Sequence, residues 1–303
     1  MNVVEALVPV FALIALGAVL HRTNFIDEGS WRAVERVTYY VLFPCFLFNA
    51  ITAADFTGQP VGELALVLVG AIAVMTALVY ATQAIFKFDG PAFTSVFQGA
   101  LRFNSYVALA AIASLLGTQG IALSAIAVAI MVPLLNTMCV MVLMRHASDI
   151  EATAIMFAKQ FVQNPLIMSC LAAIVVQVLG IPMPKVLLTT VDMAGKAALP
   201  LGLLAVGASL DLADARARPL PVVVASALRL LAMPTLVLAG TLIVGLDGIA
   251  KTAALICGSV PGASSSYILA RQLGGDAPLM ANITTAQTLA AMVTMPLILW
   301  VFA

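Results

Sequence analysis

Charged residues are scarce in this chain, which excludes an ordinary water-soluble fold. Only 9% of its 303 residues are Asp, Glu, Lys or Arg, whereas 63% are hydrophobic, and the mean hydropathy is +1.11. A soluble domain needs many more charged and polar side chains to cover its surface. About 20 apolar residues cross a bilayer as one helix, and apolar runs of that length follow one another here. The composition predicts an all-α membrane protein with many spans.

Residues typical of catalysis are also few. The two histidines, His21 and His146, fall in expected loops. The sequence contains no His-Glu-x-x-His, no Gly-x-Ser-x-Gly and no phosphate-binding glycine loop, so metal-dependent hydrolysis, serine hydrolysis and ATP use lack their residues. We expect no enzymatic activity, no cofactor and no metal site. The four cysteines, which have unrelated spacings in apolar runs, are expected to be buried small hydrophobes: Cys45, Cys139, Cys170 and Cys257.

Apolar runs separated by turn residues predict ten membrane spans. The turns include Asp89-Gly90-Pro91 and Gly117-Thr118-Gln119-Gly120. Residues 1–10 contain no Lys or Arg, unlike a signal peptide, so we expect the first span to be retained. The expected spans are 3–20, 33–52, 62–86, 92–116, 120–144, 153–179, 186–210, 220–245, 250–271 and 278–302.

Basic residues outside the spans predict the orientation. The loops after even-numbered spans, together with both termini, contain only Lys185 and Lys251. Lys and Arg concentrate in cytoplasmic loops of membrane proteins. We therefore expect a protein of the cell (inner) membrane with both termini on the outer, periplasmic side. The loops after odd-numbered spans contain Arg22, Arg32, Arg36, Lys87, Arg145, Arg216, Arg218 and Arg271.

The ten spans are expected to form two related halves, residues 1–146 and 153–303. Five spans are an odd number, so the second half enters the membrane from the opposite side. This predicts a 5+5 inverted repeat within one transport unit. Similar residues recur at nearly the same separation, pairing Pro9 with Pro165, Phe43-Pro44 with Leu199-Pro200, and Tyr106 with Tyr267.

Polar and small residues interrupt the fourth span at 98–106 and the ninth at 258–267. Paired interruptions in two halves are typical of the binding site of a secondary transporter. Broken helices leave backbone groups without partners in lipid, and half-helix N-termini favour a carboxylate. The same residues also permit tight helix packing, so both interpretations stay open. The candidate substrate-binding residues are Asn104, Ser105, Pro261, Gly262, Ser264, Ser265 and Ser266.

Four basic residues fall inside spans, where a charge is costly. Arg102 is positioned either to attract an anion to the interruption or to extend towards the cytoplasm. Lys159 and Arg229 lie nearer span ends or polar neighbours, so we expect them to extend to the membrane surface. Lys196 follows Asp192 by four residues on one helix face.

The Asp192–Lys196 pair has two open interpretations, a structural ion pair or a pair that couples a co-ion or an anion to transport. Two amides on neighbouring spans, Asn49 and Asn164, add polar groups. They are expected either to hold the scaffold to moving helices or to cap backbone near Pro165.

Several short motifs, in order along the chain, resemble the auxin efflux carrier family, specifically its bacterial branch of malonate- and malate-type permeases. The resemblance implies ten helices, with the fourth and ninth discontinuous and crossed as in sodium–proton antiporters and bile-acid symporters. It also implies a scaffold bundle (helices 1, 2, 6 and 7) and a crossover bundle (helices 3–5 and 8–10). The motifs are Leu42-Phe43-Pro44, Phe48-Asn49, Phe103-Asn104-Ser105, Asn164-Pro165-Leu166-Ile167, Leu199-Pro200-Leu201, Val206-Gly207-Ala208-Ser209-Leu210, Val260-Pro261-Gly262-Ala263-Ser264-Ser265 and Leu269-Ala270.

Plant members of this family carry a proline in each crossover helix, where this chain has Ala111 and Ser266. Auxin is therefore not expected as substrate. The leading hypothesis is a secondary active carrier of small organic anions, mono- or dicarboxylates, that works by alternating access with a possible H⁺ or Na⁺ co-ion. The alternative is a sodium- or proton-coupled carrier in which cation binding is primary. Expected partners are the anion, the lipid bilayer and, through the scaffold helices, a second copy; no nucleic acid is expected.

Overall fold

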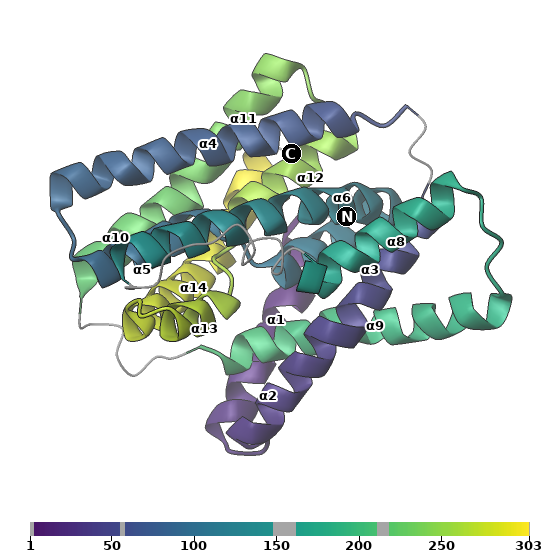
Figure 1. Ribbon diagram of the computed structural model, residues 1–303, viewed down its shortest axis with the longest axis horizontal. Helices are drawn as coiled ribbons and strands as arrows, with labels where there is room; N and C mark the ends of the chain where they lie inside the picture. Colours follow the sequence, from purple (N-terminus) through teal and green to yellow (C-terminus); the bar gives the residue numbers. More distant parts are fainter. Residues whose placement is uncertain (1–2, 55–57, 148–161, 211–217, 303) are drawn as a thin grey trace. The chain divides into compact units, whose positions relative to one another are not determined.

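Helices are the regular elements of the part of the chain that the structure describes, residues 3–54, 58–147, 162–210 and 218–302 (Figure 1). The structure is a computed structural model. Six helical segments in these ranges are long and apolar enough to cross a membrane, and two shorter apolar helices accompany them. The predicted all-α, multi-pass membrane protein is confirmed. The ten-span inverted repeat stays a prediction, because several expected spans are divided into shorter helices.

The chain divides into two compact units, which we call unit 1 and unit 2. Unit 1 contains Met1–Val61, Leu109–Pro133 and Ala154–Ser209, and unit 2 contains Gly62–Ala108, Leu134–Thr153 and Leu210–Ala303. Each unit is therefore assembled from segments that are distant in sequence. Part of the expected sixth span, including Lys159, lies outside the described residues.

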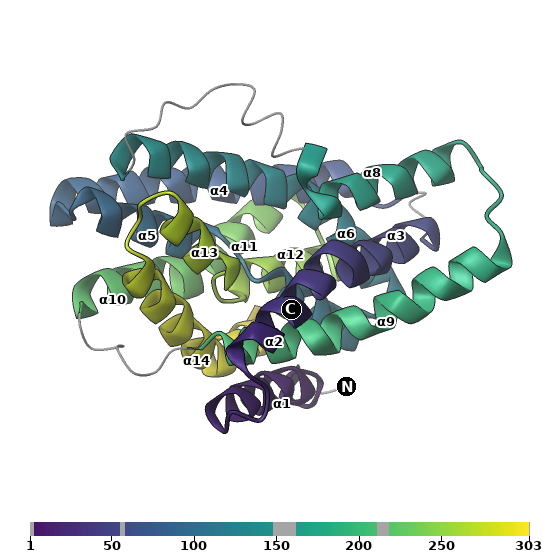
Figure 2. The ribbon, with the colours of Figure 1, turned by 60° about the horizontal axis from the view of Figure 1, so that its bottom comes forward.

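Unit 1 is built on a close contact between α1 (Val3–Arg22) and α9 (Lys185–Ala208) (Figure 2). Gly17 faces the carbonyl of Leu204, and Gly207 faces the carbonyl of Ile14. A Cβ atom at either glycine would overlap the opposing backbone. Small residues permit this approach, and in lipid the resulting dispersion contacts replace the hydrophobic effect as the force that holds helices together.

The other helices of unit 1 pack around this pair. Helix α2 (Glu28–Val37) leads through a π turn into α3 (Phe43–Thr52), and α3 packs against both α9 and α8 (Pro165–Val178). Asp27 caps α2, because its carboxylate accepts from the hydroxyl and backbone N–H of Ser30 at 2.5 and 2.9 Å. These hydrogen bonds favour the charged form and lower the pKa of the Asp27 carboxyl.

Two π turns, Thr38–Leu42 and Leu228–Ala232, precede prolines at the start of the next helix, Pro44 and Pro234. Proline has no N–H with which to continue the regular helical ladder. In both places the residue just before the proline donates five residues back instead, from Phe43 to Thr38 and from Met233 to Leu228. The wider turn keeps the helix axis continuous past the missing donor.

Unit 2 contains the remaining helices. Helix α4 (Val61–Phe86) precedes α5 (Gly90–Leu101), and α5 packs against α10 (Pro219–Ala227) and α14 (Ala277–Phe302) (Figure 1). Helices α11 (Met233–Val244), α12 (Gly248–Ser259) and α13 (Ser265–Gln272) complete it. Arg218, at the start of α10, donates to Asp89 and Asp276 at 3.1 and 3.2 Å. These two carboxylates cap α5 and α14, so one guanidinium joins three helix N-termini.

Helix α6 (Ser105–His146) supplies residues to both units and is sharply broken at Gly117, where φ is 61° and ψ is −152°. This backbone conformation is available at little cost only to glycine. The sequence predicted a four-residue connection here, 117–120, between separate spans. A single residue makes the turn instead, since helical geometry resumes immediately after it.

The close contact in unit 1 generates the first prediction. Gly207→Ala places a methyl group against the Ile14 carbonyl, and such overpacking costs about 1–3 kcal/mol. We expect the midpoint of thermal unfolding in detergent to fall by several degrees. Gly70→Ala in α4 is the matched control, because among the described residues no atom beyond the adjacent backbone of its own helix lies within 4 Å of the added Cβ. Equal midpoints for the two variants would show that the contact does not matter for stability.

Candidate functional site

Both predicted interruptions are present in unit 2, and we call them together the paired break. Helix α5 ends at Leu101, and Arg102 is extended with φ −70° and ψ 140°. Helix α12 ends at Ser259, and Val260 is extended with φ −71° and ψ 153°. The paired break comprises residues 102–104 and 260–264. Each segment therefore interrupts a helix within an apolar stretch of sequence.

The two segments contact each other directly. The backbone N–H of Asn104 donates to the carbonyl of Pro261 at 2.9 Å. The Arg102 guanidinium donates to the Ser265 hydroxyl at 3.1 Å and to the Gln98 side-chain oxygen at 3.4 Å. Arg102 thus contacts residues that flank the paired break, Gln98 in α5 and Ser265 at the start of α13, and its attraction of an anion stays a prediction.

Local sequence explains why the helices end here. Pro261 has no N–H and disfavours helical geometry in the residue before it, so α12 ends just ahead of it. The Asn104 side-chain oxygen accepts from the N–H groups of Tyr106 and Val107 at 3.1 and 3.2 Å, which caps α6. An added Cβ at position 262 would lie 2.6 Å from the Gln287 side-chain oxygen, so any larger residue there would displace Gln287.

Gln287 of α14 is a structural residue of the paired break that the sequence analysis did not identify. Its side-chain oxygen accepts from the Gly262 N–H at 2.8 Å, and its amide nitrogen donates to the carbonyls of Gly99 and Ala225 at 3.0 and 3.2 Å. One buried amide therefore connects three chain segments. Its position in the middle of an apolar span was the available signal in the sequence.

The position of Arg229 differs from the prediction. It was expected to extend to the membrane surface, but its side chain is fully buried, with 0% exposure. Its Nε donates to the Val260 carbonyl at 2.8 Å, and one terminal nitrogen donates to the Cys257 carbonyl at 2.7 Å. The π turn Leu228–Ala232 contains it. Buried backbone acceptors, which sequence alone does not reveal, hold this arginine in the interior.

The buried side-chain donors near the paired break that lack a hydrogen-bond partner among the described residues include the Asn104 amide nitrogen, the Gln98 amide nitrogen, the Ser266 hydroxyl and one terminal nitrogen of Arg229. A buried polar group without a partner costs about 1–3 kcal/mol. The first-turn N–H groups of α6, which were expected to face a ligand, are instead engaged by Asn104. At the start of α6, the unpaired donor is therefore the amide nitrogen of the Asn104 side chain.

The other predicted serines occupy different positions. Ser105 begins α6 and is half-buried, and Ser264 precedes α13 without a side-chain cap hydrogen bond. Ser265 accepts from Arg102. Of the cysteines, Cys139, Cys170 and Cys257 are buried and Cys45 is half-buried, close to expectation.

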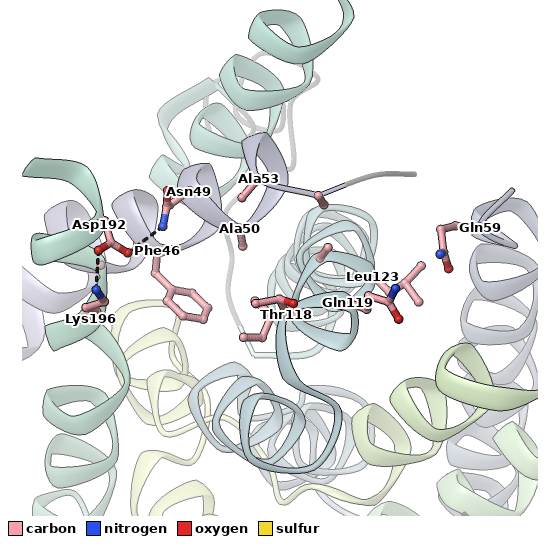
Figure 3. Close-up of a pocket in the computed structure, with 14 residues that line it drawn as sticks. Phe46, Asn49, Ala50, Ala53, Gln59, Thr118, Gln119, Leu123, Asp192 and Lys196 are labelled. Atoms are coloured by element: carbon pink, nitrogen blue, oxygen red, sulfur yellow. Dashed lines mark hydrogen bonds and ion pairs between the residues drawn. The ribbon is translucent and has the colours of Figure 1, made fainter. Parts of the chain in front are cut away.

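A cavity of about 350 Å³ lies within unit 1 and contains the predicted Asp192–Lys196 pair (Figure 3). Lys196 donates to Asp192 at 2.5 Å, and the Asn49 amide donates to the other oxygen of Asp192 at 3.0 Å. The ring of Phe46 points inward between this group and the opposite wall. The lining residues are Phe46, Asn49, Ala50, Ala53, Ala54, Gln59, Thr118, Gln119, Ile121, Ala122, Leu123, Asp192, Gly195 and Lys196.

Asn49 and Asn164, which the sequence treated alike, do different things. Asn49 orients Asp192 from α3. Asn164 caps α8, since its side-chain oxygen accepts from the N–H groups of Leu166 and Ile167 at 3.0 and 3.3 Å. The structure therefore contains one of the two roles expected of Asn164, the capping of backbone near Pro165.

A sequence model of a family described as "Membrane transport protein" matches residues 2–299. The chain belongs to this family. It is the auxin efflux carrier-like family that the sequence motifs indicated, and its description is that of membrane transport proteins.

Proteins similar to this chain are named as transporters or cotransporters. The chain is similar to an uncharacterized transporter of Methanothermobacter thermautotrophicus, 22% identical over 98% of this chain and 97% of that protein. It also matches sodium/bile acid cotransporter 4 of mouse and of human, at 34% and 33% identity over 110 residues. Those matches cover 35% of this chain and only 25% of each cotransporter.

The Gln287 network generates the second prediction. Gln287→Leu leaves the Gly262 N–H and the carbonyls of Gly99 and Ala225 without this partner. The Ala225 carbonyl keeps the Leu228 N–H as a donor. For the Gly262 N–H and the Gly99 carbonyl, we expect a loss of about 1–3 kcal/mol each. The measurement is chemical or thermal unfolding in detergent. Gln272→Leu, at an exposed position of α13, is the control; a loss of similar size there would contradict a specific role for Gln287.

Proposed function

We propose that this transporter moves small organic anions, mono- or dicarboxylates, across the inner membrane by alternating access, with the anion bound at the paired break. The observation that carries the proposal is the group of buried donors without partners, on Asn104, Gln98 and Ser266. A carboxylate has two oxygens and about four acceptor positions. Such a guest satisfies donors that the protein leaves unpaired, and a cation does not.

The distribution of charge supports an anion. The sequence contains no Asp or Glu between residues 90 and 146, or between 248 and 275. These stretches include both segments of the paired break and also Arg102. In a medium of low dielectric constant, positive charge and oriented donors favour a negatively charged guest strongly.

Cation-primary transport is the second candidate, and the partial match to sodium/bile acid cotransporters favours it. A sodium ion requires oxygen ligands, and the paired break offers backbone carbonyls but no carboxylate side chain. The Asp192 carboxylate in the cavity of unit 1 is the better place for a co-ion. Under this proposal Asp192 exchanges Lys196 for a proton or Na⁺ during the cycle.

The inverted repeat and the two-bundle organisation are part of the proposal. Unit 1 contains α1, α3, α8 and α9, which fall in expected spans 1, 2, 6 and 7, and supports the idea of a scaffold. Unit 2 contains the paired break, as a crossover bundle requires. Unit 1 also holds residues 109–133, which the expected scaffold did not include. Dimerisation through scaffold helices stays a prediction.

Uptake into proteoliposomes tests the proposal. Wild-type protein should show saturable uptake of at least one of malonate, malate and succinate. Ser266→Ala removes one buried donor at constant shape, and we expect its KM to rise about tenfold or more, because a hydrogen bond to a charged group contributes about 1.5–3 kcal/mol. Ser169→Ala, whose hydroxyl bonds within α8, should leave the KM unchanged. Absence of carboxylate uptake by the wild type would refute the proposal.

Gradients of Na⁺ and H⁺ applied in the same vesicles separate the two candidates. Anion transport that continues without either gradient, driven by the substrate alone, opposes a cation-primary mechanism. If a gradient drives uptake, Asp192→Asn should abolish that dependence while Asn164→Ala, which alters only a helix cap, should preserve it. Dependence that survives in Asp192→Asn would exclude Asp192 as the coupling group.

The proposed orientation has its own test. In a Cys45→Ala background, Lys185→Cys should react with a membrane-impermeant maleimide in intact cells, and Arg22→Cys only after lysis. Both positions are exposed, and the native cysteines other than Cys45 are buried. The reverse pattern of labelling would invert the assignment of basic loops to the cytoplasm.

A further inference from the structure

Arg229 combines full burial with two strong hydrogen bonds to the backbone at the end of a half-helix. Its partners, the carbonyls of Cys257 and Val260, lie at the C-terminal end of α12. The last carbonyls of a helix have no donor within the helix, and in an apolar interior each needs one. A guanidinium satisfies two at once from a fixed, planar fork.

The hydrogen bond from Arg229 to Val260 affects the peptide group that follows, between Pro261 and Gly262. The Val260 carbonyl is directed to Arg229, and the next carbonyl, that of Pro261, is directed to the Asn104 N–H at 2.9 Å. The following N–H, that of Gly262, is directed to Gln287 at 2.8 Å. Two consecutive peptide groups are thus held by three partners: Arg229 holds the 260–261 peptide, and Asn104 and Gln287 hold the two ends of the 261–262 peptide. Removal of Arg229 frees the first peptide, whose orientation helps to fix the second.

The charge on Arg229 is the second observation. No Asp or Glu occurs between residues 219 and 244, between 248 and 275, or between 277 and 302, which are the stretches that contain α10 to α14. The C-terminal dipole of α12 carries about half a negative charge and offsets the guanidinium in part. A buried cation that is only partly offset makes its surroundings favourable for an anion.

We propose that Arg229 is a positioning and specificity-determining residue of the paired break: it orients residues 260–262 by holding the end of α12, and its buried charge sets the preference for anionic substrates. The positioning role stands on geometry alone, whereas the specificity role rests on the function proposed above. Arg229 acts through the backbone of its partners, so we do not place it in contact with the substrate.

Hydrogen exchange tests positioning without any transport assay. In Arg229→Met, which keeps much of the side-chain volume, the amides of Asn104 and Gly262 should exchange at least tenfold faster than in the wild type. Amides of α4 should be unaffected. Arg271→Met, at an exposed position of α13, is the matched control and should change neither. A folded Arg229→Met protein with wild-type exchange at Asn104 and Gly262 would overturn the positioning role. Faster exchange throughout unit 2 would also overturn it, as a merely structural loss.

Arg229→Lys covers the case in which the methionine variant does not fold. Lysine keeps the charge and loses the fork, so Asn104 and Gly262 should exchange faster, with a smaller change than in the methionine variant. Wild-type exchange in the lysine variant would contradict the need for two donors.

Uptake of malonate tests specificity. Arg229→Met should raise the KM for malonate at least tenfold more than Arg229→Lys does, because only the lysine variant keeps the charge. Equal KM values for the two variants would overturn the specificity role. If the wild type takes up no malonate, the specificity role fails together with the carboxylate substrate, while the exchange result still decides the positioning role.

Discussion

In a lipid bilayer every backbone N–H and C=O needs a partner within the protein. Two helices of unit 2, α5 and α12, end at the paired break, where their last peptide groups have no partner within the helix. The protein meets the requirement by pairing the breaks. Asn104 donates to Pro261 across the contact, and Arg229 and Gln287 supply the donors and acceptor that the half-helices lack. The site and the stability of unit 2 are thus consequences of one arrangement of peptide groups.

The two units handle polar groups in different ways. In unit 2 the polar side chains bond mainly to backbone, and the helices around the paired break carry no carboxylate. In unit 1 the Lys196 ammonium neutralises the Asp192 carboxylate at the wall of a cavity, and the Asn49 amide donates a hydrogen bond to that carboxylate. Lys196 remains largely exposed there, with 74% side-chain exposure. The polar groups of unit 2 are thus mainly buried donors, whereas those of the unit 1 cavity form an ion pair that is partly exposed.

Sequence patterns were sufficient for much of this architecture. Hydropathy and turn residues predicted where helices run, and Pro261, Gly262 and Asn104 predicted where two of them break. The i, i+4 spacing predicted the Asp192–Lys196 contact. Arg229 was misjudged, because its partners are backbone atoms from a distant segment, and no pattern of residue types encodes them. Gln287 was missed for the same reason. Periodicity describes which side of a helix is apolar, whereas satisfaction of backbone groups depends on tertiary contacts.

The Arg218 cluster has a mechanical consequence. One guanidinium holds two carboxylates, and those carboxylates cap α5 and α14 while Arg218 itself starts α10. The N-termini of three helices are therefore joined by ion pairs to one guanidinium. If the first turn of any of them slid along its axis, opposite charges would separate. Because these ion pairs are partly exposed, each restrains such sliding by only about 0–1 kcal/mol, which favours concerted displacement of the three N-termini without enforcing it.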